Sequence, residues 1–198
     1  KIITLMKDNF YKSKFKKKNI VINELDFKNK SKFLEFFKLV KLLKSDNPDI
    51  MITWLYHSDF IGSLAGKIAN VKNILWNIRG TIKPHMGLKE FIYYKLLSYF
   101  SFYFPKKIIS CSLEGIKQHQ KFGYKKNIFH YIPNGISFSH DSISDQISDK
   151  LIDKKILKEK FVISMIARYH EQKNHHLLIE SFIELEKYFE NKIVLLLI

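Results

Sequence analysis

Arginine occurs at two positions of this lysine-rich chain, Arg79 and Arg168. Each directly follows a short apolar run of the kind that forms a buried β-strand. The planar guanidinium presents a fork of donors that suits phosphate or carboxylate, whereas the lysine ammonium acts as a point charge. We therefore predict that both arginines face an anionic ligand, with ordinary ion pairing as the alternative.

Arg168 and Lys173 lie in a polar turn between the apolar run 161–167 and a predicted helix at 174–190. Free backbone N–H groups and the helix dipole at a helix N-terminus favour an anion. The two cations could supply what a glycine-rich loop supplies through its backbone. The turn is predicted to bind phosphate, and the alternative is a pair of solvated loop charges.

Polar side chains also follow the apolar runs 49–55, 73–78 and 107–112. Ligands of open parallel sheets bind beyond the carboxyl ends of the strands, so these positions are candidates for a site. We predict catalytic roles for His57 and Arg79, with a hydrogen-bonded histidine at a helix start as the alternative for His57. The histidines near Arg168 lack the carboxylates or cysteines of a known metal pattern, so no metal is predicted.

Short apolar runs alternate with helical patterns along the whole chain, which predicts an α/β fold with a mainly parallel, doubly wound sheet. Ser31, Ser112, and either Ser58 or Asp59 are expected to cap helix N-termini, and Gly123 is expected at a helix C-terminus. The predicted strands are 1–6, 19–25, 49–55, 73–78, 107–112, 128–133, 161–167 and 192–198, and the predicted helices are 31–45, 58–69, 87–103, 112–122, 145–153 and 174–190.

Composition predicts a globular protein, because 46% of the residues are hydrophobic. No apolar run approaches the roughly 18–20 residues of a membrane span, and the N-terminal residues lack signal-peptide features, so the expected compartment is the cytoplasm. The lone Cys111 excludes an internal disulfide and a cysteine-based zinc site. The net charge of +15 comes almost entirely from lysine and indicates either a solvated surface or attraction to anionic lipid or substrate.

The segment 87–107 is more aromatic than a helix with one buried face requires. One interpretation is core packing on both sides. The other is a face that rests on an anionic membrane surface, with its aromatic rings at headgroup depth beside Lys95, Lys106 and Lys107.

Segments 48–71, 107–137 and 161–185 resemble, in order and spacing, the retaining GT-B glycosyltransferases of family 4. The resemblance implies hexosyl transfer from a nucleotide-sugar, expected to be a UDP-sugar, to a glycan, polysaccharide or lipid-linked acceptor. It implies retention of configuration, no metal or other cofactor, and a cytoplasmic enzyme that could be peripheral on the membrane. In that family the arginine and lysine matched by Arg168 and Lys173 grip the donor diphosphate.

The resemblance also implies two Rossmann-like domains facing a cleft, here 1–135 on the acceptor side and 136–198 on the donor side. Both are expected to be incomplete, because the family's first strand would precede Lys1 and its Glu-x7-Glu motif would follow Ile198. The 198 residues alone are therefore expected to be inactive. Arg79 stands where the family commonly has a histidine near the reacting centre. The acceptor side is predicted to include Ser58, Asp59, Gly80, Thr81 and Ser112.

Two alternative functions remain open at this point. A GT-B nucleotide-sugar epimerase would show carboxylates for proton abstraction. A basic RNA-binding module would fit the charge, but the sequence lacks an RNP-like aromatic strand, a KH loop and an arginine-rich patch. We therefore predict no nucleic-acid partner.

Overall fold

The computed structural model describes residues 1–7, 15, 18–82, 86–136 and 160–198. The chain forms two compact units, Lys1–Ile136 and Ser137–Ile198, which are described separately. The predicted helix 145–153 lies outside the described residues. In the part of the chain that is described, each remaining predicted strand and helix is confirmed within a few residues.

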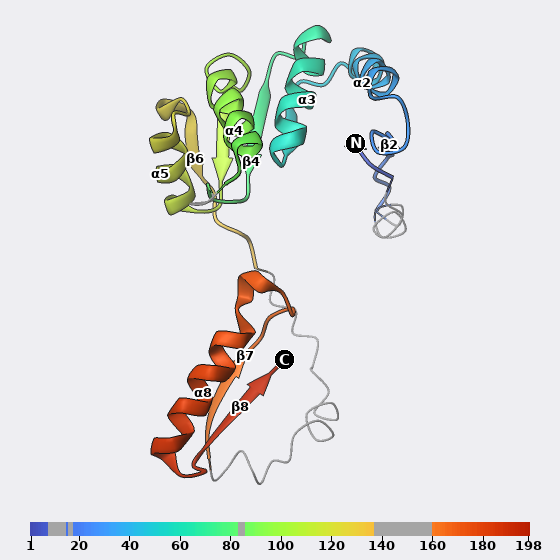
Figure 1. Ribbon diagram of the computed structural model, residues 1–198. Helices are drawn as coiled ribbons and strands as arrows, with labels where there is room; N and C mark the ends of the chain where they lie inside the picture. Colours follow the sequence, from blue (N-terminus) through green and yellow to red (C-terminus); the bar gives the residue numbers. More distant parts are fainter. Residues whose placement is uncertain (8–14, 16–17, 83–85, 137–159) are drawn as a thin grey trace. The chain divides into compact units, whose positions relative to one another are not determined.

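The first unit is built on parallel strands, in agreement with the predicted fold class (Figure 1). One sheet has the order β3-β4-β5-β6, and a second pairs β1 with β2. Its elements are β1 (Ile2–Thr4), β2 (Ile22–Glu24), α2 (Lys32–Asp46), β3 (Met51–Trp54), α3 (Tyr56–Ile68), β4 (Ile74–Ile78), α4 (Leu88–Phe100), β5 (Lys107–Ser110), α5 (Leu113–Phe122), the short 3-10 helix η1 (Lys126–Ile128) and β6 (Phe129–Tyr131).

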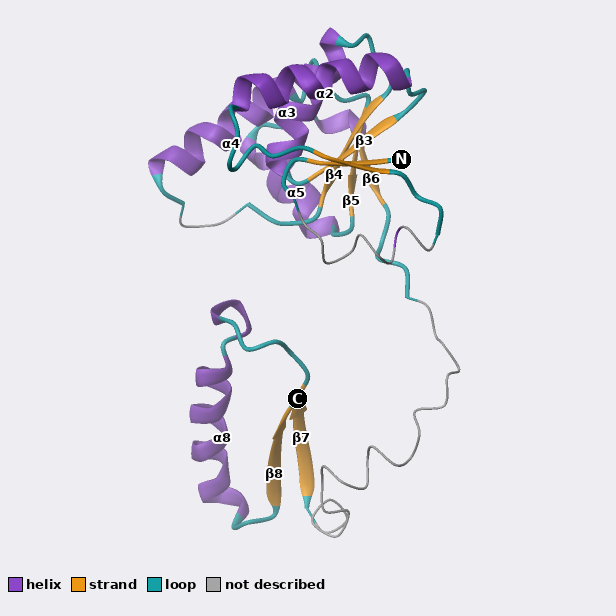
Figure 2. Cartoon of the chain, turned by 90° about the vertical axis from the view of Figure 1, so that its right-hand side faces the viewer, coloured by secondary structure: helices purple, strands orange, loops and turns teal. Residues whose placement is uncertain are grey.

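Helices α2, α3 and α4 lie on one side of strands β3–β6 (Figure 2). Helix α3 packs so closely on the sheet that a Cβ at Gly62 would lie 2.9 Å from Thr53 Cγ2. Trp76 and Ile108, on the central strands β4 and β5, are completely buried in the core beneath these helices. Alternation of side chains along β3 therefore turns Thr53 toward α3, and turns Ile52 and Trp54 to the opposite face.

The helix ends confirm some capping predictions and overturn others. Ser112 accepts a hydrogen bond from Gly115 N at 3.1 Å, and Gly123 ends α5 with φ 118°, both as predicted. Ser31 occupies the N-cap position of α2, but its side chain makes no capping hydrogen bond. The prediction for α3 was wrong, because the helix begins at Tyr56, ahead of both predicted caps, and its N-cap is Leu55 with φ 72°.

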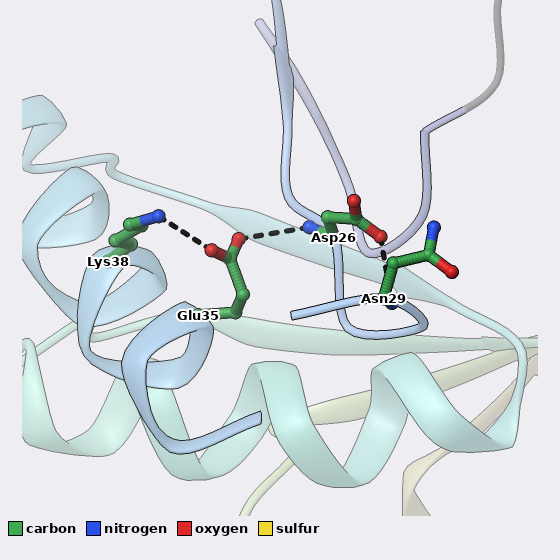
Figure 3. A network of polar contacts seen from close by, with 4 residues as sticks. All are labelled: Asp26, Asn29, Glu35 and Lys38. Carbon is green, nitrogen blue, oxygen red and sulfur yellow. Dashed lines mark hydrogen bonds and ion pairs between the residues drawn. The ribbon is translucent and has the colours of Figure 1, made fainter. Parts of the chain in front are cut away.

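Glu35 anchors the start of α2 to the chain that follows β2 (Figure 3). Its carboxylate accepts hydrogen bonds from Asp26 N at 2.9 Å and from Lys38 Nζ at 2.6 Å. Both bonds lower the pKa of Glu35, the one from Lys38 more strongly. Asp26 Oδ1 in turn accepts from Asn29 N at 3.1 Å. The network fixes the turn between β2 and α2 without a serine cap.

The second unit is a strand–helix–strand. Strand β7 (Phe161–Met165) pairs in parallel with β8 (Ile193–Leu197), and α8 (His175–Phe189) connects them after the short 3-10 helix η2 (Glu171–Lys173). This is the arrangement that the sequence predicts for 161–198.

None of the helices in the described part of the chain combines the length and the apolar character that a membrane span requires.

Candidate functional site

A pocket of about 550 Å³ lies at the carboxyl ends of the strands of the first unit. We call it the rim pocket. In open parallel sheets this edge is where ligands bind. Its lining residues are Ile52, Trp54, Asn77, Arg79, Ile109, Ile132, Pro133, Asn134 and Gly135.

Arg79 is held in place at the rim pocket. Its Nη2 donates a hydrogen bond to Asn134 Oδ1 at 2.5 Å, which links the end of β4 to the turn after β6. Both side chains are exposed, so a bound ligand can reach the remaining guanidinium donors. The guanidinium fork therefore already faces the pocket as a donor for an oxygen-rich or anionic group.

Trp54 and Asn77 add an aromatic face and an amide to the same pocket. Half of the Trp54 side chain is exposed, so its indole presents a flat apolar face. Asn77 is buried, and its Oδ1 has no hydrogen-bond partner among the described residues. An aromatic face beside an amide oxygen that accepts and guanidinium groups that donate suits a sugar ring that carries hydroxyl or anionic substituents.

The turn that carries Arg79 rests on the start of α5. A Cβ at Gly115 would lie 3.3 Å from Gly80 O, so the helix and the turn are in close contact. Beneath them, Tyr56 Oη and His119 Nε2 lie 3.0 Å apart, and His119 Nδ1 lies 2.7 Å from Gly115 O. Burial lowers the pKa of His119, so the neutral ring donates to Gly115 and accepts from Tyr56. This buried chain of contacts supports the Arg79 turn from below.

The other predicted residues of the first unit do not line the rim pocket. His57 is exposed on the first turn of α3, with its ring 5.3 Å from that of Tyr93. Ser112 is committed to the cap of α5. Gly80 and Thr81 are exposed in the turn after β4. Ser58 lines a separate groove near β1. Among the site residues predicted for the first unit, it is Arg79 that lines the rim pocket.

Asp59 lies in the core and not at the surface. It is almost completely buried and accepts a hydrogen bond from Thr53 Oγ1, while its Oδ2 has no partner among the described residues. Burial raises the pKa of Asp59 to about 7, against the smaller opposing effect of the Thr53 hydrogen bond. In a sequence, an aspartate near a helix start is expected to be the N-cap. Asp59 lies instead within α3, and its side chain faces Thr53 on β3.

Sequence reasoning missed Trp54, Asn77 and Asn134. A signal for Asn134 was available, because it lies in the Pro-Asn-Gly turn directly after the strand 128–133. The rule that sites form beyond strand ends covers this position. Trp54 and Asn77 lie within strands, where only the three-dimensional packing shows which side chains reach a pocket.

In the second unit, Arg168 and Lys173 are exposed in the turn between β7 and α8. His170 Nδ1 accepts from Gln172 N at 3.2 Å and orders the turn. The N-cap of α8, Asn174, has φ 51° and makes no side-chain capping bond. The two cations therefore precede a helix whose first N–H groups no capping side chain occupies, as the phosphate prediction requires.

The histidines of this turn have separate environments. His175 is buried with its ring 5.2 Å from that of Tyr169, and His176 Nδ1 lies 3.3 Å from Glu180 Oε1. Within the described ranges, no group of three or more histidine, cysteine or acidic side chains is arranged to hold a metal ion.

No protein-family model matches this sequence, and no curated protein matches it. Solved structures do. HepE of Anabaena in complex with UDP-glucose matches with a TM-score of 0.74 and 15% identity, over 99% of this chain and 52% of its own. A glycosyltransferase of Rickettsia africae matches with a TM-score of 0.55 and 18% identity, over 99% of this chain and 59% of its own.

The UDP-GlcNAc 2-epimerase of Methanocaldococcus jannaschii also matches, with a TM-score of 0.52 and 13% identity, over 98% of this chain and 56% of its own. Identities this low show the fold alone. The chain spans little more than half the length of these three proteins. It therefore has an α/β fold of the GT-B type, built from parallel, Rossmann-like units.

Proposed function

We propose that this protein is a glycosyltransferase that transfers a hexose from a UDP-sugar to a glycan, polysaccharide or lipid-linked acceptor. In this proposal the second unit binds the donor and the first unit binds the acceptor. The observation that carries it is the position of Arg168 and Lys173, both exposed ahead of the uncapped N-terminus of α8. The GT-B fold, and a match to a protein solved with UDP-glucose, support it.

The proposed role of the two cations is to hold the donor diphosphate. Negative charge develops on the leaving nucleoside diphosphate as the glycosidic bond to the sugar breaks. Fixed cations and backbone N–H groups aimed at that charge stabilise the transition state more than the ground state. Arg168 and Lys173 would thereby do the work that a divalent ion does in other transferases, which is why we propose a metal-independent reaction. Retention of configuration belongs to the same proposal through the resemblance to family 4.

The rim pocket is the proposed acceptor site. Trp54 would stack on a sugar ring, and Arg79 would bind hydroxyl or anionic substituents through the donors that Asn134 leaves free. Such contacts would position the acceptor, and positioning can lower the barrier of a two-substrate transfer by about 7–11 kcal/mol. The catalytic role of His57 stays a prediction. Its side chain does not line the rim pocket, so the proposed acceptor contacts do not include it.

A membrane surface is the proposed location of the acceptor. Large apolar side chains on α4 are exposed, among them Leu88, Phe91, Ile92 and Tyr99. Two of the three lysines predicted to accompany them already have partners: Lys95 Nζ donates to Phe122 O at 2.8 Å, and Lys106 Nζ donates to Asn73 Oδ1 at 2.6 Å. We propose that this face of α4 rests on anionic lipid, with the exposed Lys107 at the start of β5 as the remaining predicted cation.

An epimerase is the second candidate, and the match to the UDP-GlcNAc 2-epimerase favours it. Epimerisation needs no acceptor, so the two functions separate in one experiment. The full-length protein is incubated with radiolabelled UDP-sugars, with and without acceptor glycans, in the presence of EDTA.

Transfer of label to an acceptor despite EDTA supports the proposed function. Conversion of the donor to its epimer in the absence of acceptor supports the epimerase. Calorimetric titration of UDP then compares wild type with Arg168→Ala, and with Lys187→Ala as a control that removes an exposed cation paired to Glu184 on α8. Equal affinity for UDP in all three would contradict the donor site.

A further inference from the structure

The rim pocket is lined by a single charged side chain. Among the described residues that line it, Arg79 is the one cation, and no aspartate or glutamate accompanies it. In the part of the chain that the structure describes, the ion pairs involve other side chains and leave the Arg79 guanidinium without a carboxylate. Its charge is therefore available to an anion that enters the pocket.

Three acidic residues that are near the lining strands in sequence are held away from this charge. Asp49 precedes β3 at its amino end, whereas the pocket lies at the carboxyl ends of the strands. Asp59 lies on the helix-covered face, because it accepts a hydrogen bond from Thr53. Glu114 Oε1 accepts from Gln118 Nε2 at 3.1 Å along α5. The counter-charge for Arg79 must then come from a ligand.

The register of the sheet places an aromatic face and an amide side by side in the pocket. Trp54, Asn77 and Ile109 are paired positions on β3, β4 and β5, so their side chains share one face of the sheet. The buried Asn77 Oδ1 has no partner among the described residues and needs a donor. Arg79 follows two residues later, which is roughly 6–7 Å along an extended chain.

This spacing suits one hexose ring that lies flat on the indole of Trp54. A ring hydroxyl would donate to Asn77 Oδ1, and a substituent at the other end of the ring would accept from Arg79. The pocket volume of about 550 Å³ is that of a small-molecule site. Ring and substituent can thus be bound together.

A neutral sugar would leave the charge of Arg79 uncompensated. Much of the remaining lining is apolar, namely Ile52, Ile109, Ile132 and Pro133, so a bound ring would displace water from the guanidinium. A hydroxyl group returns one neutral acceptor, whereas a carboxylate offers two charged oxygens that match the fork. A phosphate dianion would bring two charges to one cation. A single carboxylate balances the pocket.

We propose that the rim pocket binds an acceptor sugar that carries a carboxylate, of the hexuronic acid class. This inference rests on the proposed function, in which the rim pocket is the acceptor site, and it names the chemical class of that acceptor. Arg79 pairs with the carboxylate through the donors that Asn134 leaves free. Trp54 stacks on the ring, and Asn77 accepts from a ring hydroxyl.

Binding of matched hexosides tests the proposal. The probes are methyl glucuronide, its neutral amide, methyl glucoside and methyl glucoside 6-phosphate, with the galacto series in parallel. Ligand-observed NMR measures their affinities for the full-length protein without a donor. The carboxylate should bind about 10-fold more tightly than the amide, which keeps the shape and loses the charge. The 6-phosphate should bind no more tightly than the carboxylate, because the pocket offers one cation.

Variants of Arg79 assign the preference to the guanidinium. In Arg79→Ala the carboxylate and the amide should bind with equal affinity. Arg79→Lys should keep part of the preference, because lysine supplies the charge without the fork. Lys187→Ala removes an exposed cation of α8 and should keep the full preference.

Equal affinity of the wild type for the carboxylate and the amide would overturn the proposal, as would a preference that survives Arg79→Ala. Tighter binding of the 6-phosphate, or no binding of any probe, would overturn it as well. Transfer of label to a neutral acceptor together with equal affinities would overturn this inference and leave the sugar-transfer proposal intact. Failure of the donor site appears separately, as equal affinity for UDP in wild type and Arg168→Ala.

Discussion

The two arginines of this protein occupy contrasting environments. Arg79 is bonded to Asn134, lines a formed pocket and rests on a turn supported by the buried Tyr56–His119 pair. Arg168 is exposed in a turn whose described residues show no hydrogen bond to its guanidinium. The difference indicates that the proposed acceptor side is preorganised by the first unit. The proposed donor side, in contrast, presents free cations that a diphosphate would order.

Arg168 should give the largest effect if it binds the charge that develops on the leaving group. In the full-length protein, Arg168→Ala should lower kcat/KM by about 10²–10³-fold, and Arg168→Lys should recover part of the loss. Lys173→Ala should act in the same direction, and the double variant should be less than additive because both cations would hold one diphosphate. Steady-state kinetics measures this, with Lys187→Ala as the control. Wild-type kinetics in both Arg168→Ala and Lys173→Ala would contradict the proposed role of these cations in binding the donor diphosphate.

The buried Asp59 should make the stability of the first unit depend on pH. Its pKa is raised to about 7 from an ordinary value of 3.8, so the folded state binds a proton that the unfolded state has released. Stability should therefore fall as the pH rises from about 4 to about 7, by on the order of 1.4 kcal/mol per pH unit at the steepest.

Above pH 7 the loss should be complete, and Asp59→Asn should remove the pH dependence in this window. Urea denaturation at a series of pH values measures the free energy of unfolding. Identical pH profiles for Asp59→Asn and wild type would show that the carboxyl is ionised in the fold.

Replacing Arg79 should weaken binding of the acceptor and leave binding of the donor unchanged. Arg79→Ala should raise the KM for acceptor by roughly 10-fold, since hydrogen bonds to charged groups contribute about 1.5–3 kcal/mol and Asn134 already engages part of the guanidinium. The affinity for UDP should not change. Asn134→Ala should have a smaller effect, because it removes only the tether of Arg79. A loss of UDP affinity in Arg79→Ala would place both arginines on the same ligand.

The smallest effect is expected for the exposed face of α4. Replacing Lys89 and Lys107 by glutamate should weaken binding to anionic liposomes by roughly 1 kcal/mol for each charge near the surface. These lysines are chosen because Lys95 and Lys106 have structural partners whose loss would confuse the result. Vesicle co-sedimentation measures the partitioning, and Lys187→Glu in the second unit is the control. Equal partitioning of all variants would make α4 an ordinary surface helix.

Local signals explain why most of the fold could be predicted. The strands of the first unit could be predicted because short apolar runs, rich in β-branched residues, alternate with helical patterns. This pattern requires no knowledge of distant contacts. Ser112 and Gly123 were predicted correctly for the same reason, since a serine ahead of a helix and a glycine at φ 118° satisfy backbone requirements within one turn.

The candidate site was less predictable. Arg79 and Arg168 could be selected as candidates because arginine is rare here and both follow strands. Trp54, Asn77 and Asn134 come from β3, β4 and the turn after β6, and only the parallel register of the sheet brings them to one pocket. Asp59 was misassigned because a polar residue at a helix start has two possible partners, the helix backbone or a neighbouring strand.

The sequence by itself determined the α/β class, the order of the elements and the two cationic turns, because periodicity, capping and charge are properties of neighbouring residues. Tertiary structure alone decided which polar groups reach a ligand and which stay inside. It placed Asp59 against Thr53 and hydrogen-bonded Arg79 to Asn134. These outcomes depend on contacts between residues that lie on different elements, and their free energies appear only when the sheet has assembled.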